Sequence, residues 1–180
     1  MLQRVMIFID GSNMYHNLMN TFGKATINYH KFSLKLTGTD RELIRTYYYN
    51  CPIDQDKDPN AYKAQQRFLD SLSNTPYLEV RLGRLQRKID GTVIEKGVDV
   101  KISVDMITKA FKNQYDVAIL VSGDADFVEV VQEVKDQAKH VELAVFPSQQ
   151  CYHLRKCSDR VIILNEEFMR DCWLPIKTRG

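Results

Sequence analysis

The sequence has no long hydrophobic run, no paired cysteine motif and no nucleotide-binding loop. Its longest apolar stretches, Val5–Ile9 and Val117–Val121, are far shorter than the roughly 20 residues that cross a bilayer, so we expect neither a membrane span nor a membrane partner. The four cysteines contain no CxxC pair, which favours reduced thiols in a cytoplasmic protein. Neither GxxxxGKS/T nor GxGxxG occurs, which argues against motor or dinucleotide chemistry.

An excess of charge of either sign is also missing. Lys and Arg number 25 and Asp and Glu number 23, so the formal net charge of +2 identifies no acidic partner. The chain of 180 residues, of which 44% are hydrophobic, is long enough to bury one core. We therefore expect a single domain over residues 1–170 and a C-terminal tail over residues 171–180. The sequence does not indicate an oligomeric state, and a homodimer is a hypothesis.

Short β-branched runs alternate along the chain with segments of helical period. This alternation is typical of a mostly parallel sheet with helices on both faces, so it predicts a three-layer α/β/α sandwich. The expected strands cover residues 5–9, 43–49, 77–82, 117–121, 141–146 and 161–164. The expected helices cover residues 12–22, 29–36, 59–72, 97–111 and 127–139. Asp90-Gly91 between two short strand-like runs, 85–89 and 92–95, predicts a β-hairpin insertion.

Acidic residues follow two of the predicted strands directly. Asp10 comes after the strand 5–9, and Asp124 and Asp126 come after the strand 117–121. In open parallel sheets, ligands bind beyond the carboxyl ends of the strands, so these carboxylates are expected at one edge. Each motif also has a structural interpretation, because Asp and Asn are favoured helix N-caps.

The predicted helix 97–111 carries two further acids. Asp99 lies in its first turn, where it either faces the same edge or complements the helix dipole. Asp105 is expected on the solvated face, in surface ion pairs with Lys101 and Lys109. The stripe expected to face the core consists of Val100, Val104, Ile107 and Phe111.

Four clustered acids would repel one another unless a cation neutralises them. The oxygen ligands of Asp10, Asp99, Asp124 and Asp126 favour Mg²⁺ or Mn²⁺ over zinc. Such an ion polarises phosphoryl oxygens and acidifies bound water, which suits hydrolysis of a phosphodiester. Asn13 is placed to hold that water or a phosphate.

Three motifs together carry a family resemblance. F-I-D-G-S-N at 8–13, K-G-V-D-V-K at 96–101 and S-G-D-A-D-F at 122–127 resemble the NYN-domain proteins of the LabA-like branch, which belong to the PIN-like nucleases. The resemblance spans about residues 3–165 and implies a PIN-like sheet and metal-dependent ribonuclease chemistry. It also implies that the acids of these motifs hold the metal, with Asn13 as their polar companion and Asp105 as an outer or structural acid.

Basic and aromatic residues supply candidate RNA contacts. A strip on the predicted strand and hairpin is formed by Arg81, Arg84, Arg87 and Lys88, and its alternative is a solvated, salt-bridged face. Ser12 and Ser122, in the first and third motifs, are added to these candidates. In the run Tyr47–Tyr49, alternate side chains are expected to point inward, which leaves one or two to stack on bases.

The residues leave three hypotheses for function. The first is a metal-dependent ribonuclease acting on single-stranded or structured RNA. The second is a non-catalytic RNA-binding or regulatory module that keeps the acidic pocket. The third, a phosphatase with Asp10 as nucleophile, resembles the haloacid-dehalogenase-like enzymes but lacks their second Asp, because that position is Ser12.

Overall fold

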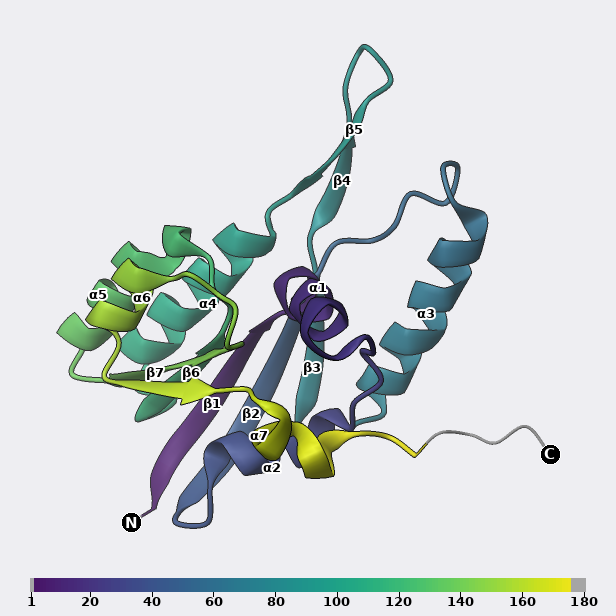
Figure 1. The fold of residues 1–180 in the computed structure, drawn as a ribbon. Helices are drawn as coiled ribbons and strands as arrows, with labels where there is room; N and C mark the ends of the chain where they lie inside the picture. Colours follow the sequence, from purple (N-terminus) through teal and green to yellow (C-terminus); the bar gives the residue numbers. More distant parts are fainter. Residues whose placement is uncertain (1, 176–180) are drawn as a thin grey trace.

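Six parallel strands form the central sheet of the structure, a computed structural model that describes residues 2–175 (Figure 1). Their order across the sheet is β3-β2-β1-β6-β7-β8, and every neighbouring pair is parallel. The strands are β1 (Gln3–Asp10), β2 (Arg41–Asn50), β3 (Leu78–Leu82), β6 (Val117–Val121), β7 (His140–Val145) and β8 (Arg160–Ile163). The predicted parallel sheet is confirmed.

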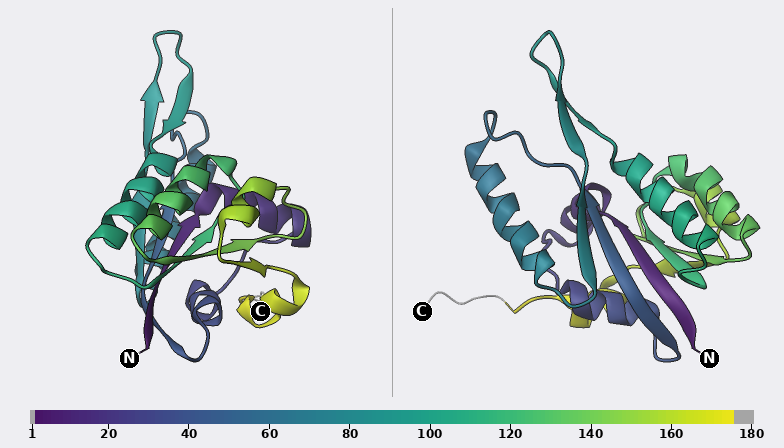
Figure 2. Two further views of the ribbon diagram at one scale, coloured as in Figure 1. Left: turned by 90° about the vertical axis from the view of Figure 1, so that its left-hand side faces the viewer. Right: turned by 180° about the vertical axis from the view of Figure 1, so that it is seen from behind.

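Helices cover both faces of this sheet (Figure 2). One face packs against α1 (Gly11–Phe22), α2 (Tyr29–Thr37), α3 (Pro59–Ser73), α7 (Glu166–Met169) and the short turn η2 (Arg170–Cys172). The other packs against α4 (Val98–Phe111), α5 (Val128–Asp136) and α6 (Tyr152–Cys157). Along β1, Val5, Ile7 and Ile9 face the first layer, whereas Met6 and Phe8 face the second, because successive side chains alternate. This is the expected three-layer sandwich.

The predicted hairpin is also confirmed, as a separate two-stranded sheet. β4 (Arg84–Arg87) pairs antiparallel with β5 (Val93–Lys96), and the pair extends beyond the carboxyl end of the central sheet (Figure 1). Gly91 in its tip has φ of 82°, a backbone conformation that glycine adopts without a steric cost. The hairpin leads directly into α4, so its second strand ends beside the first turn of that helix.

All three tyrosines of the run 47–49 are buried, which corrects the expectation that one or two are free to stack on bases. β2 lies inside the sheet with helices on both faces, so inward-facing and outward-facing side chains are both covered. Tyr48 packs with the α1–α3 layer, and Tyr47 and Tyr49 pack with the α4–α5 layer.

The helix α4 presents a different face to the core from the one predicted. Val100, Val104 and Phe111 are 65%, 55% and 77% exposed, and the buried positions include Ile102, Met106 and Ala110. The expected apolar stripe is therefore wrong at these three positions, whereas its fourth member, Ile107, is partly buried and packs against the core. The helix is rotated so that Asp105 faces inward, because side chains of the sheet form hydrogen bonds and an ion pair with this carboxylate that offset its loss of hydration.

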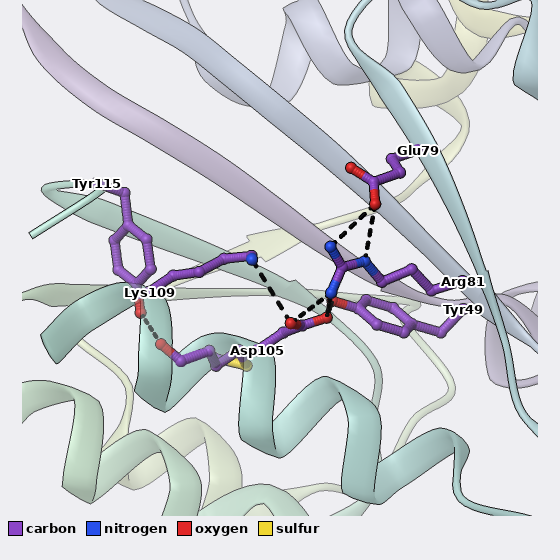
Figure 3. A network of polar contacts seen from close by, with 7 residues as sticks. Tyr49, Glu79, Arg81, Asp105, Lys109 and Tyr115 are labelled. Carbon is purple, nitrogen blue, oxygen red and sulfur yellow. Dashed lines mark hydrogen bonds and ion pairs between the residues drawn. The ribbon is translucent and has the colours of Figure 1, made fainter. Parts of the chain in front are cut away.

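Figure 3 shows those partners around Asp105. The hydroxyl of Tyr49 donates to Oδ2 of Asp105 at 2.7 Å, and Nη1 of Arg81 contacts both carboxylate oxygens at 2.6 and 2.7 Å. Nζ of Lys109 lies 3.5 Å from Oδ1, and Glu79 holds the other side of the Arg81 guanidinium. The expectation of a solvated Asp105 is wrong, and within residues 2–175 its expected ion pair with Lys101 does not form, whereas the one with Lys109 is present. The network joins α4 to β2 and β3.

The chain packs against the domain up to the end of the described residues. Cys172 is buried, and Trp173 forms an isolated bridge with Ile27. The predicted tail begins at residue 171, and its residues 176–180 lie outside the described part, so the division of the chain stays a prediction. Within residues 2–175, no helix is long and apolar enough to pass through a bilayer.

Replacing Asp105 tests whether this network stabilises the domain. Asp105→Ala removes the acceptor of Tyr49 and leaves the Arg81 charge without its partner, so we expect a loss of about 2 kcal/mol in the free energy of unfolding. Asp105→Asn, which keeps an acceptor, should lose less. Urea titration measures both, with Asp70→Ala on the exposed face of α3 as the control. Equal stability of Asp105→Ala and the control would show that the network contributes nothing.

Candidate functional site

Asp10 joins the ends of two neighbouring strands. It is the last residue of β1 and the N-cap of α1, where its Oδ1 accepts a hydrogen bond from the backbone N–H of Asn13 at 3.1 Å. Its Oδ2 accepts from the hydroxyl of Ser122, at the end of β6, at 3.1 Å. Gly11 permits the sharp passage into α1, because a Cβ there would overlap the ring of Tyr48. Asp10 is 6% exposed, and its carboxylate makes no ion pair with any residue from 2 to 175.

Asp124 belongs to the loop that follows β6. Its backbone N–H donates to Oγ of Ser122 at 3.2 Å, and its Oδ1 accepts from the backbone N–H of Asp126 at 3.0 Å. Asp124 thus caps the short turn η1 (Ala125–Phe127) while its second carboxylate oxygen stays uncommitted within the described residues. Ser122 is buried and bridges Asp10 and Asp124, so we leave it out of the RNA contacts predicted for it.

Asp99 approaches these acids from α4. Gly97, with φ of 84°, turns the chain from β5 into the helix and places Asp99 in the first turn. Partial burial raises the pKa of the Asp99 carboxyl, and the negative charges of Asp124 and Asp126 raise it further. The helix and the loop after β6 therefore bring their acids within electrostatic range of each other.

The acids line one open cleft of about 390 Å³. Asp10, Asp99 and Asp124 contribute to its wall together with Ser12 and Asn13, while Asp126 is exposed beside it. Three predicted acids and both predicted polar residues of the first motif are thus brought together. The cleft lies at the carboxyl ends of β1 and β6, the position expected for a ligand site in an open parallel sheet.

The charge balance of this cleft differs from that of the rest of the domain. Three acids are buried, and of these Asp105 and Glu142 are each held by an arginine, whereas Asp10 makes no ion pair within residues 2–175; the more exposed Asp99, Asp124 and Asp126 make none either. Burial raises the pKa of the Asp10 carboxyl, its hydrogen bonds from Asn13 and Ser122 oppose that rise, and the charges of Asp99 and Asp124 add to it. The carboxylates of the cleft therefore repel one another.

The donor set of the cleft fits a hard divalent ion, because it consists of carboxylate oxygens with an amide and hydroxyls nearby. As they stand, no three His, Cys, Asp or Glu side chains of residues 2–175 are grouped closely enough to hold a metal. A bound ion would therefore require the carboxylates of α4 and of the β6 loop to draw together around it. Burial and neighbouring carboxylates raise the pKa of Asp10 and Asp99, and a divalent ion would relieve this repulsion.

Four residues of the cleft wall were not anticipated. His16 and Asn17 follow Asn13 by about one turn of α1, and Glu95 and Lys96 end the hairpin strand β5. The i+3 and i+4 spacing from Asn13 is a signal that could have identified the first two. Lys96 is the first residue of the second motif, three positions before Asp99, and this proximity could have identified it. Glu95 carried no such signal, because only the path of the hairpin brings it to the sheet edge.

Some residues of the predicted basic strip form ion pairs, and others do not. Arg81 is held by Asp105 and Glu79, so it has a structural role and is left out of the RNA surface. Arg87 pairs with Asp54 and Asp56 at 3.5 and 3.0 Å. Arg84 and Lys88 are exposed on the hairpin and make no ion pair with any residue from 2 to 175.

These features define an α/β domain of the PIN-like type, with acids gathered at the ends of its central parallel strands. The chain belongs to the NYN domain family, which matches residues 4–165, as its three motifs indicated. It is 27% identical over 172 residues to the low amplitude and bright protein LabA of Synechococcus elongatus, covering 91% of this chain and 84% of that protein. The crystal structure of VPA0982, a Vibrio parahaemolyticus protein of unknown function, shares the fold with a TM-score of 0.75 at 23% identity, over 93% of this chain and 96% of that one.

The raised pKa of Asp10 predicts an unusual stability effect. The folded state holds a proton on Asp10 more readily than the unfolded chain does. The free energy of unfolding therefore decreases as pH rises above 3.8, the ordinary pKa of an aspartate, because the buried carboxyl must ionise. In EDTA at pH 7, Asp10→Asn should therefore melt at a higher temperature than the wild type, because Asn keeps the N-cap without the charge.

The difference in melting temperature should shrink as pH falls towards 4. Magnesium should raise the melting temperature of the wild type and leave that of Asp10→Asn unchanged. Differential scanning calorimetry with and without the ion measures both effects. A variant that melts below the wild type in EDTA at pH 7 would contradict the assignment of Asp10 as a buried charge lacking its cation.

Proposed function

We propose that this protein is a ribonuclease that hydrolyses RNA phosphodiesters with the help of Mg²⁺ or Mn²⁺ bound at the acidic cleft. The observation that carries the proposal is a cleft lined by Asp10, Asp99 and Asp124, in which the buried Asp10 makes no ion pair within residues 2–175 although the buried Asp105 and Glu142 are both paired. The family to which the chain belongs is related to nucleases, which supports the same chemistry. A divalent ion in this position would polarise a phosphoryl oxygen and lower the pKa of a water molecule.

The chain's own residues have distinct roles in this proposal. Asp10, Asp99 and Asp124 would hold the ion, because their carboxylates line the cleft. Asp126 would orient Asp124 through the hydrogen bond from its backbone N–H. Ser122 keeps the β1 and β6 ends together through Asp10. Asn13 would hold the substrate phosphate or the attacking water.

Cations at the cleft rim would guide the RNA. Lys96 lines the same cleft as the acids, and Arg84 and Lys88 lie on the hairpin that leads away from it. Positive groups along this path would neutralise phosphates on either side of the cleaved bond. The hairpin would thus extend the RNA-binding surface beyond the sheet edge, with Ser12 as a contact at the cleft wall.

Removing single acids tests the chemistry. Asp10→Asn, Asp99→Asn and Asp124→Asn should each lower kcat for cleavage of single-stranded RNA by about 100-fold or more, because each removes an ion-holding carboxylate. Asp136→Asn, on the α5 side of the domain, is the control and should cleave like the wild type. Cleavage is measured on mixed RNA substrates in Mn²⁺, with EDTA as a blank.

Unchanged cleavage by Asp10→Asn would remove the proposed chemistry. RNA binding that persists in EDTA, with no product after long incubation of the wild type in Mn²⁺, would instead support a non-catalytic RNA-binding module.

The hairpin has its own test. The double variant Arg84→Gln/Lys88→Gln should bind single-stranded RNA more weakly and lower the slope of log K against log salt by roughly 1.4, because two phosphate contacts are lost. Lys63→Gln/Arg67→Gln on α3 removes the same charge elsewhere and is the matched control. Fluorescence anisotropy over a salt series measures both. An identical salt slope in the two double variants would exclude the hairpin from RNA binding.

A further inference from the structure

The side-chain oxygen of Asn13 is surrounded by hydrogen-bond donors. Nε2 of Gln149 donates to it at 2.9 Å, the backbone N–H of Gly123 at 3.3 Å, and Nδ2 of Asn17 at 3.3 Å. Asn13 itself lines the acidic cleft, and within residues 2–175 its own amide N–H groups donate to no other residue. The oxygen is therefore committed to the protein, and the NH₂ group is the part left for a ligand.

Two backbone N–H groups determine the orientation of both amides. The N–H of Phe146 can only donate, so the Gln149 atom that it contacts at 2.9 Å is the carbonyl Oε1. Nε2 of Gln149 is then the atom that faces Asn13. The N–H of Gly123 likewise requires an acceptor, so the oxygen of Asn13 must face it. The chain of hydrogen bonds from Phe146 to Asn13 thus has one direction.

We propose that Gln149 is a positioning residue that locks Asn13 as a hydrogen-bond donor to the cleft, and that Asn13 donates to a phosphate oxygen or the attacking water and does not ligate the metal. This inference rests on the proposed ribonuclease function. An acidic cleft repels RNA phosphates, so a donor among the acids contributes most when it cannot turn its lone pairs towards the substrate. A free asparagine amide would sample both orientations.

The loop after β7 positions Gln149 for its contact with Asn13. The backbone N–H of Gln149 donates to the carbonyl of Phe146 at 3.1 Å, and its carbonyl accepts from Nη2 of Arg155 at 3.4 Å. Gly123 makes room for it, because a Cβ at position 123 would overlap Nε2 of Gln149. The ends of β1, β6 and β7 therefore meet at this one amide.

The substitution Gln149→Glu isolates the direction of the hydrogen bond. The new carboxylate still accepts from the N–H of Phe146, but it cannot donate to Asn13. A charged acceptor outweighs the 3.3 Å contacts from Gly123 and Asn17, so the Asn13 amide is expected to turn its NH₂ towards position 149 and away from the cleft. Gln150→Glu is the matched control, because Gln150 is the exposed neighbour and receives the same charge. Gln149→Met, which removes the donor without adding charge, provides a second variant if Gln149→Glu does not fold.

Two readouts are needed. The first is independent of catalysis: the side-chain NH₂ signals of Asn13 in a ¹⁵N NMR spectrum, identified by their loss in Asn13→Ala. They should move in Gln149→Glu and stay in place in Gln150→Glu. The second is steady-state cleavage of single-stranded RNA in Mn²⁺, in which Gln149→Glu should lose about 10-fold in kcat with KM within about twofold of the control, because the donor acts mainly in the transition state.

Each outcome separates this inference from the proposed function. Unmoved Asn13 signals in Gln149→Glu overturn the lock, whether or not the protein cleaves RNA. Moved signals with kcat equal to that of Gln150→Glu also overturn it, while the ribonuclease proposal stands. Moved signals in a protein whose wild type cleaves no RNA support the lock and defeat the ribonuclease proposal instead.

Discussion

Parallel pairing of β1 with both of its neighbours is the constraint on which the site depends. Ile9 lies opposite Val121, and Asp10 lies opposite Tyr49, so the chain leaves these strands at the same edge. The carboxylate of Asp10 then meets the loop after β6 through Ser122. A shift of the register between β1 and β6 would separate the acids, because every residue after the strand would move with it.

The domain treats its buried acids in two ways. Asp105 and Glu142 receive arginines, which link α4 to β3 and the first residue of β2 to Glu142 of β7. Asp10 receives only hydrogen bonds, and its acidic neighbours raise its pKa further. A carboxylate that is buried without a cation lowers the stability of the folded state, and such groups are concentrated at functional sites. On α4, Asp105 is paired inside the domain, whereas Asp99, less than two turns away, is exposed at the cleft and makes no ion pair within residues 2–175.

Local sequence patterns predicted the sheet and both loop motifs but not the rotation of α4. The hydrophobic pattern favoured a buried face through Val100, Val104 and Phe111, because charged residues such as Asp105 are expected on the solvent-exposed face of a helix. The burial of Asp105 depends on Tyr49 and Arg81, which are distant in sequence and reach it only when β2 and β3 are assembled. The hairpin residue Glu95 was missed for a similar reason, because only the folded hairpin brings it to the cleft.

The sequence by itself determined the alternation of strands and helices, the caps at Asp10 and Asp124, and the family, because these depend on residues close together in the chain. Tertiary structure decided which acids are paired, which arginines are engaged, and which atom of Asn13 faces the cleft. Those outcomes depend on hydrogen-bond partners from distant strands, and Gln149, 136 positions from Asn13, carries no local signal of its role. Long-range contacts of this kind exist only once the parallel sheet has aligned the strand ends.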